Sequence, residues 1–110
     1  MRLTLRCISS LLNITTLNIL ICVLQVRNVI SKGIPVIASA GNENKNADTS
    51  SPARVREVIT VGATTIEDKF ASFSNFGKAV DVLAPGELVI SAGIQSDTAA
   101  AIRNGTSMAT

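Results

Sequence analysis

The C-terminal stretch of the chain contains the side chain that is best placed to act as a nucleophile. Residues 104–110 have the sequence Asn-Gly-Thr-Ser-Met-Ala-Thr, so Ser107 follows a Gly-Thr pair and precedes Met-Ala-Thr. A serine in such a stretch can lie at a strand-to-helix junction, where its hydroxyl is exposed and the helix N-terminus favours developing negative charge. Taken alone the pattern is weak, because most such serines belong to turns or cap helices.

A second polar segment could supply a hydrogen-bond donor to the same reaction. Residues 38–43 have the sequence Ala-Ser-Ala-Gly-Asn-Glu, in which Asn42 follows a glycine at the end of an apolar run. The side-chain amide of Asn42 could donate to an oxyanion at such an edge. This signal is also weak by itself, since Gly-Asn is a common turn pair.

The elements between these segments have to position them. Apolar residues at close to helical spacing predict a helix over 17–32, for which Gly33 is a suitable C-terminal cap. Short apolar runs predict strands over 34–38, 58–63, 80–84 and 88–92, and the last of these can return as an antiparallel ribbon through 99–103. This order predicts an α/β fold with a largely parallel sheet. Because parallel neighbours need crossover connections, we expect the helices that cover the sheet to lie outside this chain.

Composition and charge exclude several classes of function. Hydrophobic residues make up 46% of the 110 residues and charged residues 16%, against a typical charged share of about 25%, which favours elements buried on both faces. The net charge is +2 and the basic residues are scattered, so no nucleic-acid-binding surface is predicted. Cys7 and Cys22 form no Cys-x-x-Cys pair and have no histidine nearby, so no zinc site is predicted.

The N-terminal residues 1–24 allow two interpretations. Arg2 and Arg6 precede an apolar run at 17–24, as in a weak secretory signal, but polar residues dilute the run and no small-residue cleavage site follows. The run is also too short to cross a membrane, so we expect no stable membrane insertion. The interpretation we prefer is a helix whose upstream sequence is missing or wrongly spliced.

Six short blocks of the sequence occur in a fixed order. They are Ser-Ala-Gly-Asn-Glu-Asn at 39–44, Ser-Pro-Ala at 51–53, Val-Gly-Ala at 61–63, Phe-Ser-Asn-Phe-Gly at 73–77, Ala-Pro-Gly at 84–86 and Gly-Thr-Ser-Met-Ala-Thr at 105–110. This series closely resembles the subtilisin family of serine endopeptidases, and its second and fourth blocks are most like the proteinase K branch. The resemblance implies a fragment of a doubly wound, mostly parallel α/β sheet, with residues 25–110 as a partial peptidase domain and 1–24 as an unassigned segment.

The resemblance implies a role for each matching residue of the site. Ser107 matches the catalytic nucleophile, and Asn42 matches the side-chain donor of the oxyanion hole, which the Ser107 backbone N–H completes. One wall of the primary substrate-side-chain pocket is matched by Ser39, Ala40 and Gly41, whose backbone would pair with the substrate as an added strand.

The resemblance also implies a structural calcium ion, although the catalytic chemistry needs no cofactor. Asp81 matches an acidic calcium ligand, and the backbone carbonyls of Arg56 and Val58 match the rest of the protein part of the site. The alternative is that Asp81 caps its strand or pairs with a lysine such as Lys78. The same branch implies a cis peptide bond before Pro52.

The departures from the family pattern concern the catalytic base. The family's aspartate and histidine motifs do not occur here, and the chain has no histidine at all. We therefore expect an inactive, truncated piece of an endopeptidase, from a partial or misassembled gene model. Two alternatives are a degenerate protease domain that binds peptides or proteins without cleaving them, and a small secreted interaction protein with its own fold. We expect the parent enzyme to be monomeric, to act on peptides or proteins, and to be secreted or vacuolar.

Overall fold

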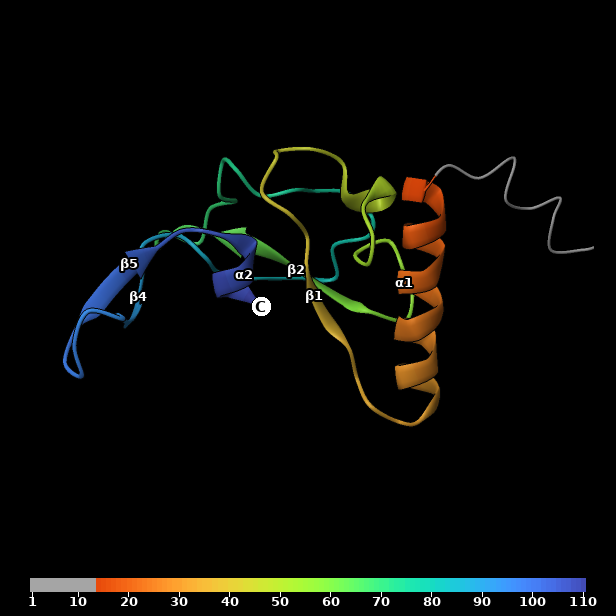
Figure 1. The fold of residues 1–110 in the computed structure, drawn as a ribbon. Coiled ribbons are helices and arrows are strands. Elements are labelled where there is room, and N and C mark those ends of the chain that lie inside the picture. Colours follow the sequence, from red (N-terminus) through yellow and green to blue (C-terminus); the bar gives the residue numbers. More distant parts are fainter. Residues whose placement is uncertain (1–13) are drawn as a thin grey trace, which may run out of the picture.

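The computed structural model describes residues 14–110, which form a mixed α/β arrangement. In chain order the elements are α1 (Ile14–Ser31), β1 (Ile37–Ser39), the 3₁₀ helix η1 (Ala47–Thr49), β2 (Ile59–Thr64), β3 (Val82–Pro85), β4 (Val89–Ala92), β5 (Ala100–Arg103) and α2 (Thr106–Ala109). The first three strands form a sheet in the order β1-β2-β3, and β4 and β5 form a separate ribbon that extends away from it (Figure 1). The predicted α/β class and the antiparallel return after β4 are confirmed.

The three-stranded sheet is parallel throughout, so its strands end at one edge. Ile37 pairs with Ile59 and Val61 with Val82. The predicted strand over 34–38 is displaced to 37–39, because Pro35 has no N–H to donate to a ladder. The carbonyl of Val36 still accepts a hydrogen bond from Ile59 N at 3.0 Å. The chain leaves β1 directly into the segment that contains Asn42, at the carboxyl edge of the sheet.

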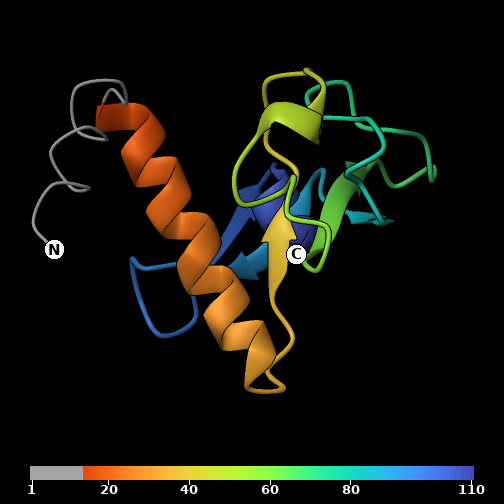
Figure 2. The same cartoon turned by 90° about the vertical axis from the view of Figure 1, so that its right-hand side faces the viewer.

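Helix α1 lies beside the sheet and converges with β1 at its C-terminal end (Figure 2). Gly33 caps it as predicted, with a φ of 80° and a hydrogen bond from its N–H to the carbonyl of Ile30 at 2.9 Å. The face of α1 that packs on the core was only partly predicted. Of the apolar residues whose spacing predicted the helix, only Ile30 packs on the core. The members of the small core cluster are Val23, Val26, Ile30 and Val36, which pack on Ala38, Val55 and Val58.

The remaining apolar positions of the predicted helical face are exposed. These positions are Leu17, Leu20, Ile21, Leu24 and Val29. The helix is apolar over most of its circumference, so spacing alone does not identify the face that packs. An ion pair between Arg27 Nε and Glu57 Oε1 at 3.4 Å adds a polar contact between α1 and the segment before β2.

A buried asparagine orders the polar loop between β1 and β2. Asn75 is 1% exposed, and its Oδ1 accepts hydrogen bonds from the backbone N–H groups of Glu43 at 3.1 Å and Lys45 at 2.9 Å. Its Nδ2 donates to the carbonyl of Ala40 at 2.9 Å. The loop is thereby held against the carboxyl edge of the sheet. The Ser51–Pro52 peptide bond within this loop is cis, as predicted.

Some predictions concern the N-terminal residues. The signal-like arginines and Cys7 fall within 1–13, outside the described residues. The predicted boundary between residues 24 and 25 lies inside α1, which continues through it. Cys22, on the same helix, is a free thiol. None of the helices within residues 14–110 combines the length and hydropathy that a membrane span requires.

Large apolar side chains of the parallel sheet are exposed. Ile37 is 52% exposed, Ile59 43% and Val82 46%, one on each of the three strands. Ile37 and Ile59 are register partners, so they lie next to each other on the sheet. An apolar surface of this kind, on a sheet with open edges, favours association with other polypeptides.

We expect the isolated chain to self-associate and to bind a hydrophobic dye, because water contacts these side chains in the monomer. Sedimentation velocity over a concentration series should show mass that rises with concentration. The double variant Ile37→Thr, Ile59→Thr should associate less, since both positions are exposed and the change leaves the core intact. A wild-type chain that stays monomeric and melts in one sharp transition would contradict this expectation.

Candidate active site

Ser107 lies in the short C-terminal helix, directly after a tight approach of two backbone segments. Gly105 N donates to the carbonyl of Gly86 at 2.8 Å, which fixes the start of α2 against the turn that follows β3. Met108 N and Thr110 N donate to the carbonyls of Gly105 and Thr106, both at 3.0 Å. The Ser107 side chain is exposed, as a nucleophile must be.

Asn42 and Thr106 join the two chemistry-bearing segments. Asn42 Oδ1 accepts hydrogen bonds from Thr106 N and from Thr106 Oγ1, both at 2.8 Å. Thr106 is fully buried, and its Oγ1 also accepts a hydrogen bond from Gly41 N at 3.2 Å. Because the Thr106 N–H needs an acceptor, the carboxamide oxygen must face it, and the Nδ2 group then points away from Thr106.

The Nδ2 group of Asn42 and the backbone N–H of Ser107 border one small space. A Cβ atom placed on Gly105 would lie 3.6 Å from Asn42 Nδ2 and 3.7 Å from Ser107 N. Neither nitrogen donates a hydrogen bond to another residue of the described chain. Two hydrogen-bond donors therefore lie within 4 Å of one point beside Gly105, and Met108 Sδ lies 3.3 Å from the same point. Such a pair can stabilise negative charge on an oxygen atom.

The three residues predicted to form a substrate-pocket wall line one cavity. Ser39, Ala40 and Gly41 border a cavity of about 470 Å³, together with the cis-bonded Ser51 and Pro52. Ala40 N donates to the carbonyl of Val61 at 2.9 Å, which continues the sheet ladder into this wall.

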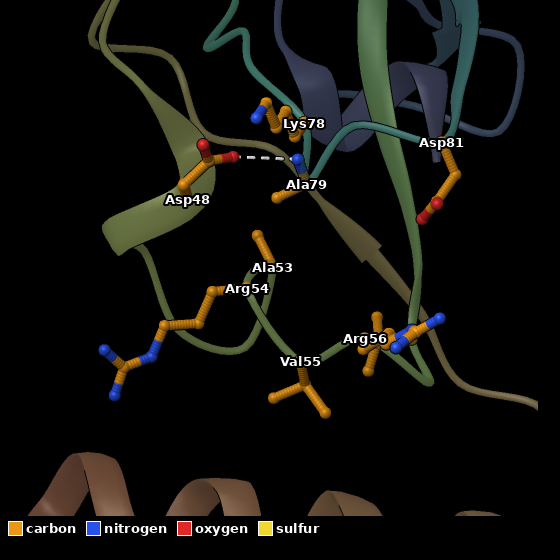
Figure 3. Close-up of a pocket in the computed structure, with 9 residues that line it drawn as sticks. Asp48, Ala53, Arg54, Val55, Arg56, Lys78, Ala79 and Asp81 are labelled. Atoms are coloured by element: carbon orange, nitrogen blue, oxygen red, sulfur yellow. Dashed lines mark hydrogen bonds between the residues drawn. The ribbon is translucent and has the colours of Figure 1, made fainter.

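The predicted calcium ligands also border one cavity, of about 250 Å³, shown in Figure 3. Asp81 Oδ2 accepts a hydrogen bond from Thr60 N at 2.8 Å, which leaves Oδ1 without a bonded donor among the described residues. The carbonyl oxygens of Arg56 and Val58 accept no hydrogen bond from that part of the chain either. One carboxylate oxygen and two carbonyls are the oxygen donors that Ca²⁺ prefers, so the residues fit the ion.

The alternative roles of Asp81 are also visible. Its bond to Thr60 N caps the end of the β2–β3 ladder, as a purely structural aspartate would. It forms no ion pair with Lys78, because the ion pairs of the described chain are Arg27–Glu57 and Lys69–Glu67. Lys78 and Arg54 also line the cavity, but in Figure 3 their charged ends point away from Asp81. Residues 14–110 contain no cluster of three or more Asp, Glu, His or Cys side chains that could hold a metal.

Two residues of the site have roles that the sequence analysis did not assign. Thr106 links Asn42 to the start of α2, and Asn75 holds the loop that carries Asn42. Both lie within the six blocks, at 73–77 and 105–110, but their partners are 30 to 65 residues away along the chain. Neither residue has a local signal for its role: Thr106 lies between Gly105 and Ser107, and Asn75 lies between Ser74 and Phe76.

Comparisons with known proteins place the chain in a family. The model of the subtilase family matches residues 17–110. The extracellular serine proteinase of Thermus sp. (strain Rt41A) is 52% identical over 85 residues, which are 77% of this chain and 21% of that protein. Cerevisin of Saccharomyces cerevisiae is 50% identical over 86 residues, which are 78% of this chain and 14% of cerevisin.

A solved structure agrees with this placement. The crystal structure of a cold-adapted subtilisin-like serine proteinase superposes with a TM-score of 0.74 at 43% identity, and the match covers 80% of this chain and 32% of that one. The chain thus spans about a fifth of the Thermus relative and a third of the solved structure. With a family model that matches most of its length, the chain belongs to the subtilase family.

Proposed function

We propose that this chain carries the nucleophile and the oxyanion hole of a subtilisin-like serine endopeptidase, and that it lacks the catalytic base. The observation that supports this most directly is that Asn42 Nδ2 and Ser107 N, neither of which donates to another described residue, lie near one point beside Gly105. Family membership supports peptide bonds as the substrate. The name of the Thermus relative supports a secreted parent enzyme, with a vacuolar one as the alternative.

The proposed reaction begins at the Ser107 hydroxyl. Its Oγ attacks the carbonyl carbon of a peptide bond, and its proton passes to a histidine that another polypeptide segment has to supply. The carbonyl oxygen becomes negatively charged and takes up hydrogen bonds from Asn42 Nδ2 and Ser107 N. The histidine then protonates the departing amine, and water releases the acyl group from the serine in a second, similar step.

The segment Ser39–Gly41 binds the substrate in this proposal. The N–H groups of Ala40 and Gly41 are bonded within the chain, to Val61 O and Thr106 Oγ1, so the segment acts as a fixed pocket wall rather than as a strand that pairs with the peptide. The cavity beside it receives the side chain that precedes the cleaved bond. Asn75 keeps the wall in place by bonding the Ala40 carbonyl.

Without histidine, we expect the isolated chain to hydrolyse peptides no faster than a Ser107→Ala control. The serine stays a neutral alcohol, and loss of the histidine base costs about 10⁶-fold in turnover in subtilisin itself, a member of this family. The measurement is release of a fluorophore from a peptide substrate at matched protein concentrations. Turnover that disappears in Ser107→Ala would overturn this expectation.

A chimera tests the oxyanion-hole proposal. Residues 25–110 would replace the corresponding segment of a complete relative that supplies the aspartate and the histidine. We expect the chimera to hydrolyse peptides, and Asn42→Ala to lower kcat by about 10²–10³-fold with little change in KM. That range is the one known for loss of the same kind of donor in subtilisin, a member of this family. The loss falls on kcat because the donor bonds an oxygen that carries full negative charge only in the transition state.

The matched variant Asn42→Asp separates the donor role from a structural role. Aspartate keeps an oxygen for Thr106 N and Thr106 Oγ1 but has no Nδ2 donor, whereas alanine loses both functions. We expect both variants to lose turnover, and only Asn42→Ala to lose about 1–3 kcal/mol of stability through its unpaired partners. If Asn42→Asp keeps wild-type kcat, Asn42 is a structural residue and the peptide-binding scaffold is the better interpretation.

We also propose that Asp81, with the Arg56 and Val58 carbonyls, holds a structural calcium ion in the completed domain. An ion at about a hundredfold excess over its Kd adds about 2.7 kcal/mol, which raises Tm by about 5 °C or more. Addition of EDTA should remove this gain, and Asp81→Asn should abolish the response to EDTA because its amide keeps an oxygen for Thr60 N but no charge. Equal Tm values with and without EDTA would leave Asp81 as the cap of the β2–β3 ladder.

A further inference from the structure

A second cavity borders Ser107, separate from the one lined by Ser39–Gly41. Its volume is about 430 Å³, with Ser107 and Met108 on one side and the β4–β5 ribbon on the other. Helix α2 contacts β1, so it lies between this ribbon and the strand that leads to Asn42 (Figure 1). Ser107 lines the ribbon-side cavity only, and the cavity lined by Ser39–Gly41 is connected to the serine's helix through the bond from Gly41 N to Thr106 Oγ1.

One face of the ribbon forms the wall of this second cavity. In the antiparallel register Val89 lies opposite Arg103 and Ser91 opposite Ala101. Because side chains alternate along a strand, these four residues share one face, and all four line the cavity with Ser107. The residues between them, Ile90 and Ile102, do not line it and are exposed. The orientation of Arg103 toward the nucleophile's cavity thus follows from the strand register.

Arg103 brings the only formal charge to this cavity. Its Nη1 donates one bond, to the adjacent carbonyl of Ile102 at 3.3 Å, and it has no carboxylate partner within the described chain. The acidic residues nearest in sequence, Glu87 before β4 and Asp97 in the ribbon turn, do not line the cavity. A guanidinium group has five N–H donors, so most of its capacity is open to a ligand.

We infer that this cavity selects substrates with an acidic side chain directly after the cleaved bond, and that Arg103 is the residue that selects them. The inference rests on the proposed function: if the Ser39–Gly41 cavity holds the side chain before the cleaved bond, the chain that follows passes Ser107 on the ribbon side. The carboxylate pairs with the Arg103 guanidinium, with the two-pronged geometry that suits this pair. The methylene groups of a glutamate pack on the apolar part of the wall, which includes Val89 and Met108.

The test uses the chimera and three peptides that differ only in the residue after the cleaved bond: Glu, Gln or Lys. We expect kcat/KM to fall in that order, with about a 1.5-fold to fivefold step between Glu and Gln, as for one exposed ion pair. Higher salt should reduce the step. In Arg103→Gln the preference for Glu should disappear, and in Arg103→Glu it should reverse in favour of Lys.

Two matched variants show whether the effect belongs to this position. Arg103→Lys keeps the charge and should keep a reduced preference. Lys32 is exposed, follows the last residue of α1, and lines neither the ribbon-side cavity nor the Ser39–Gly41 cavity. Lys32→Gln therefore removes one positive charge far from the substrate in this proposal and should leave the preference unchanged. Hydrolysis that ignores the charge of the residue after the cleaved bond would overturn the inference and leave the proposed function intact.

A chimera that hydrolyses nothing would instead count against the proposed function. Equilibrium binding to the full 110-residue chain then decides the inference, with fluorescein-labelled peptides that carry Glu or Gln. Tighter binding of the Glu peptide, lost in Arg103→Gln, supports an acid-selective subsite without catalysis. Equal binding of both peptides would overturn it.

Discussion

The site depends on the buried hydroxyl of Thr106, which donates to one partner and accepts from another. It donates to Asn42 Oδ1 and accepts from Gly41 N, so one oxygen atom fixes both the wall of the substrate cavity and the carboxamide of Asn42. The Thr106 N–H adds a second bond to the same Asn42 oxygen. Thr106 is fully buried, so loss of a partner for its N–H or hydroxyl group would cost about 1–3 kcal/mol. The geometry around Ser107 therefore follows from the hydrogen-bond requirements of a single residue.

This arrangement is possible because small residues occupy the carboxyl edge of the sheet. Ala40, Ala63 and Thr106 are buried there, and a Cβ on Gly86 would lie 2.6 Å from the Cβ of Ala63 and 2.7 Å from the carbonyl oxygen of Gly105. Backbone segments can thus approach closely enough to bond each other directly. Most of the large apolar side chains lie elsewhere, on α1, on the outer parts of the strands and on the ribbon, where many are exposed. The edge that bears the site is closely packed, while the sheet face remains open.

The sequence predicted the strands well where their signals were local. Apolar runs bounded by turn residues located β2 to β5 within about two residues, and Gly33 marked the end of α1. The packed face of α1 was not predictable in the same way, because a helix that is apolar nearly all round has no single stripe. The positions of Ser107 and Asn42 relative to each other came from resemblance to a family. The supporting roles of Thr106 and Asn75 could not be predicted, since hydrogen bonds between distant segments leave no periodic pattern.

The cavity lined by Ser107 and the cavity lined by Ser39–Gly41 are built differently, and in the proposed enzyme this difference separates catalysis from selectivity. The Ser39–Gly41 wall is backbone continued from the sheet and bonded by buried side chains, so a substitution there disturbs the neighbouring Asn42 as well. The ribbon is joined to the site by a bond from Leu88 N to the Asn104 side-chain oxygen Oδ1 at 2.7 Å and by the backbone bond from Gly105 N to Gly86 O. Its side chains on the cavity face take no part in these bonds. In the proposed enzyme the charge at position 103 can therefore change without any change in the Asn42 and Ser107 donors, so substrate preference can vary while the proposed chemistry at Ser107 stays fixed.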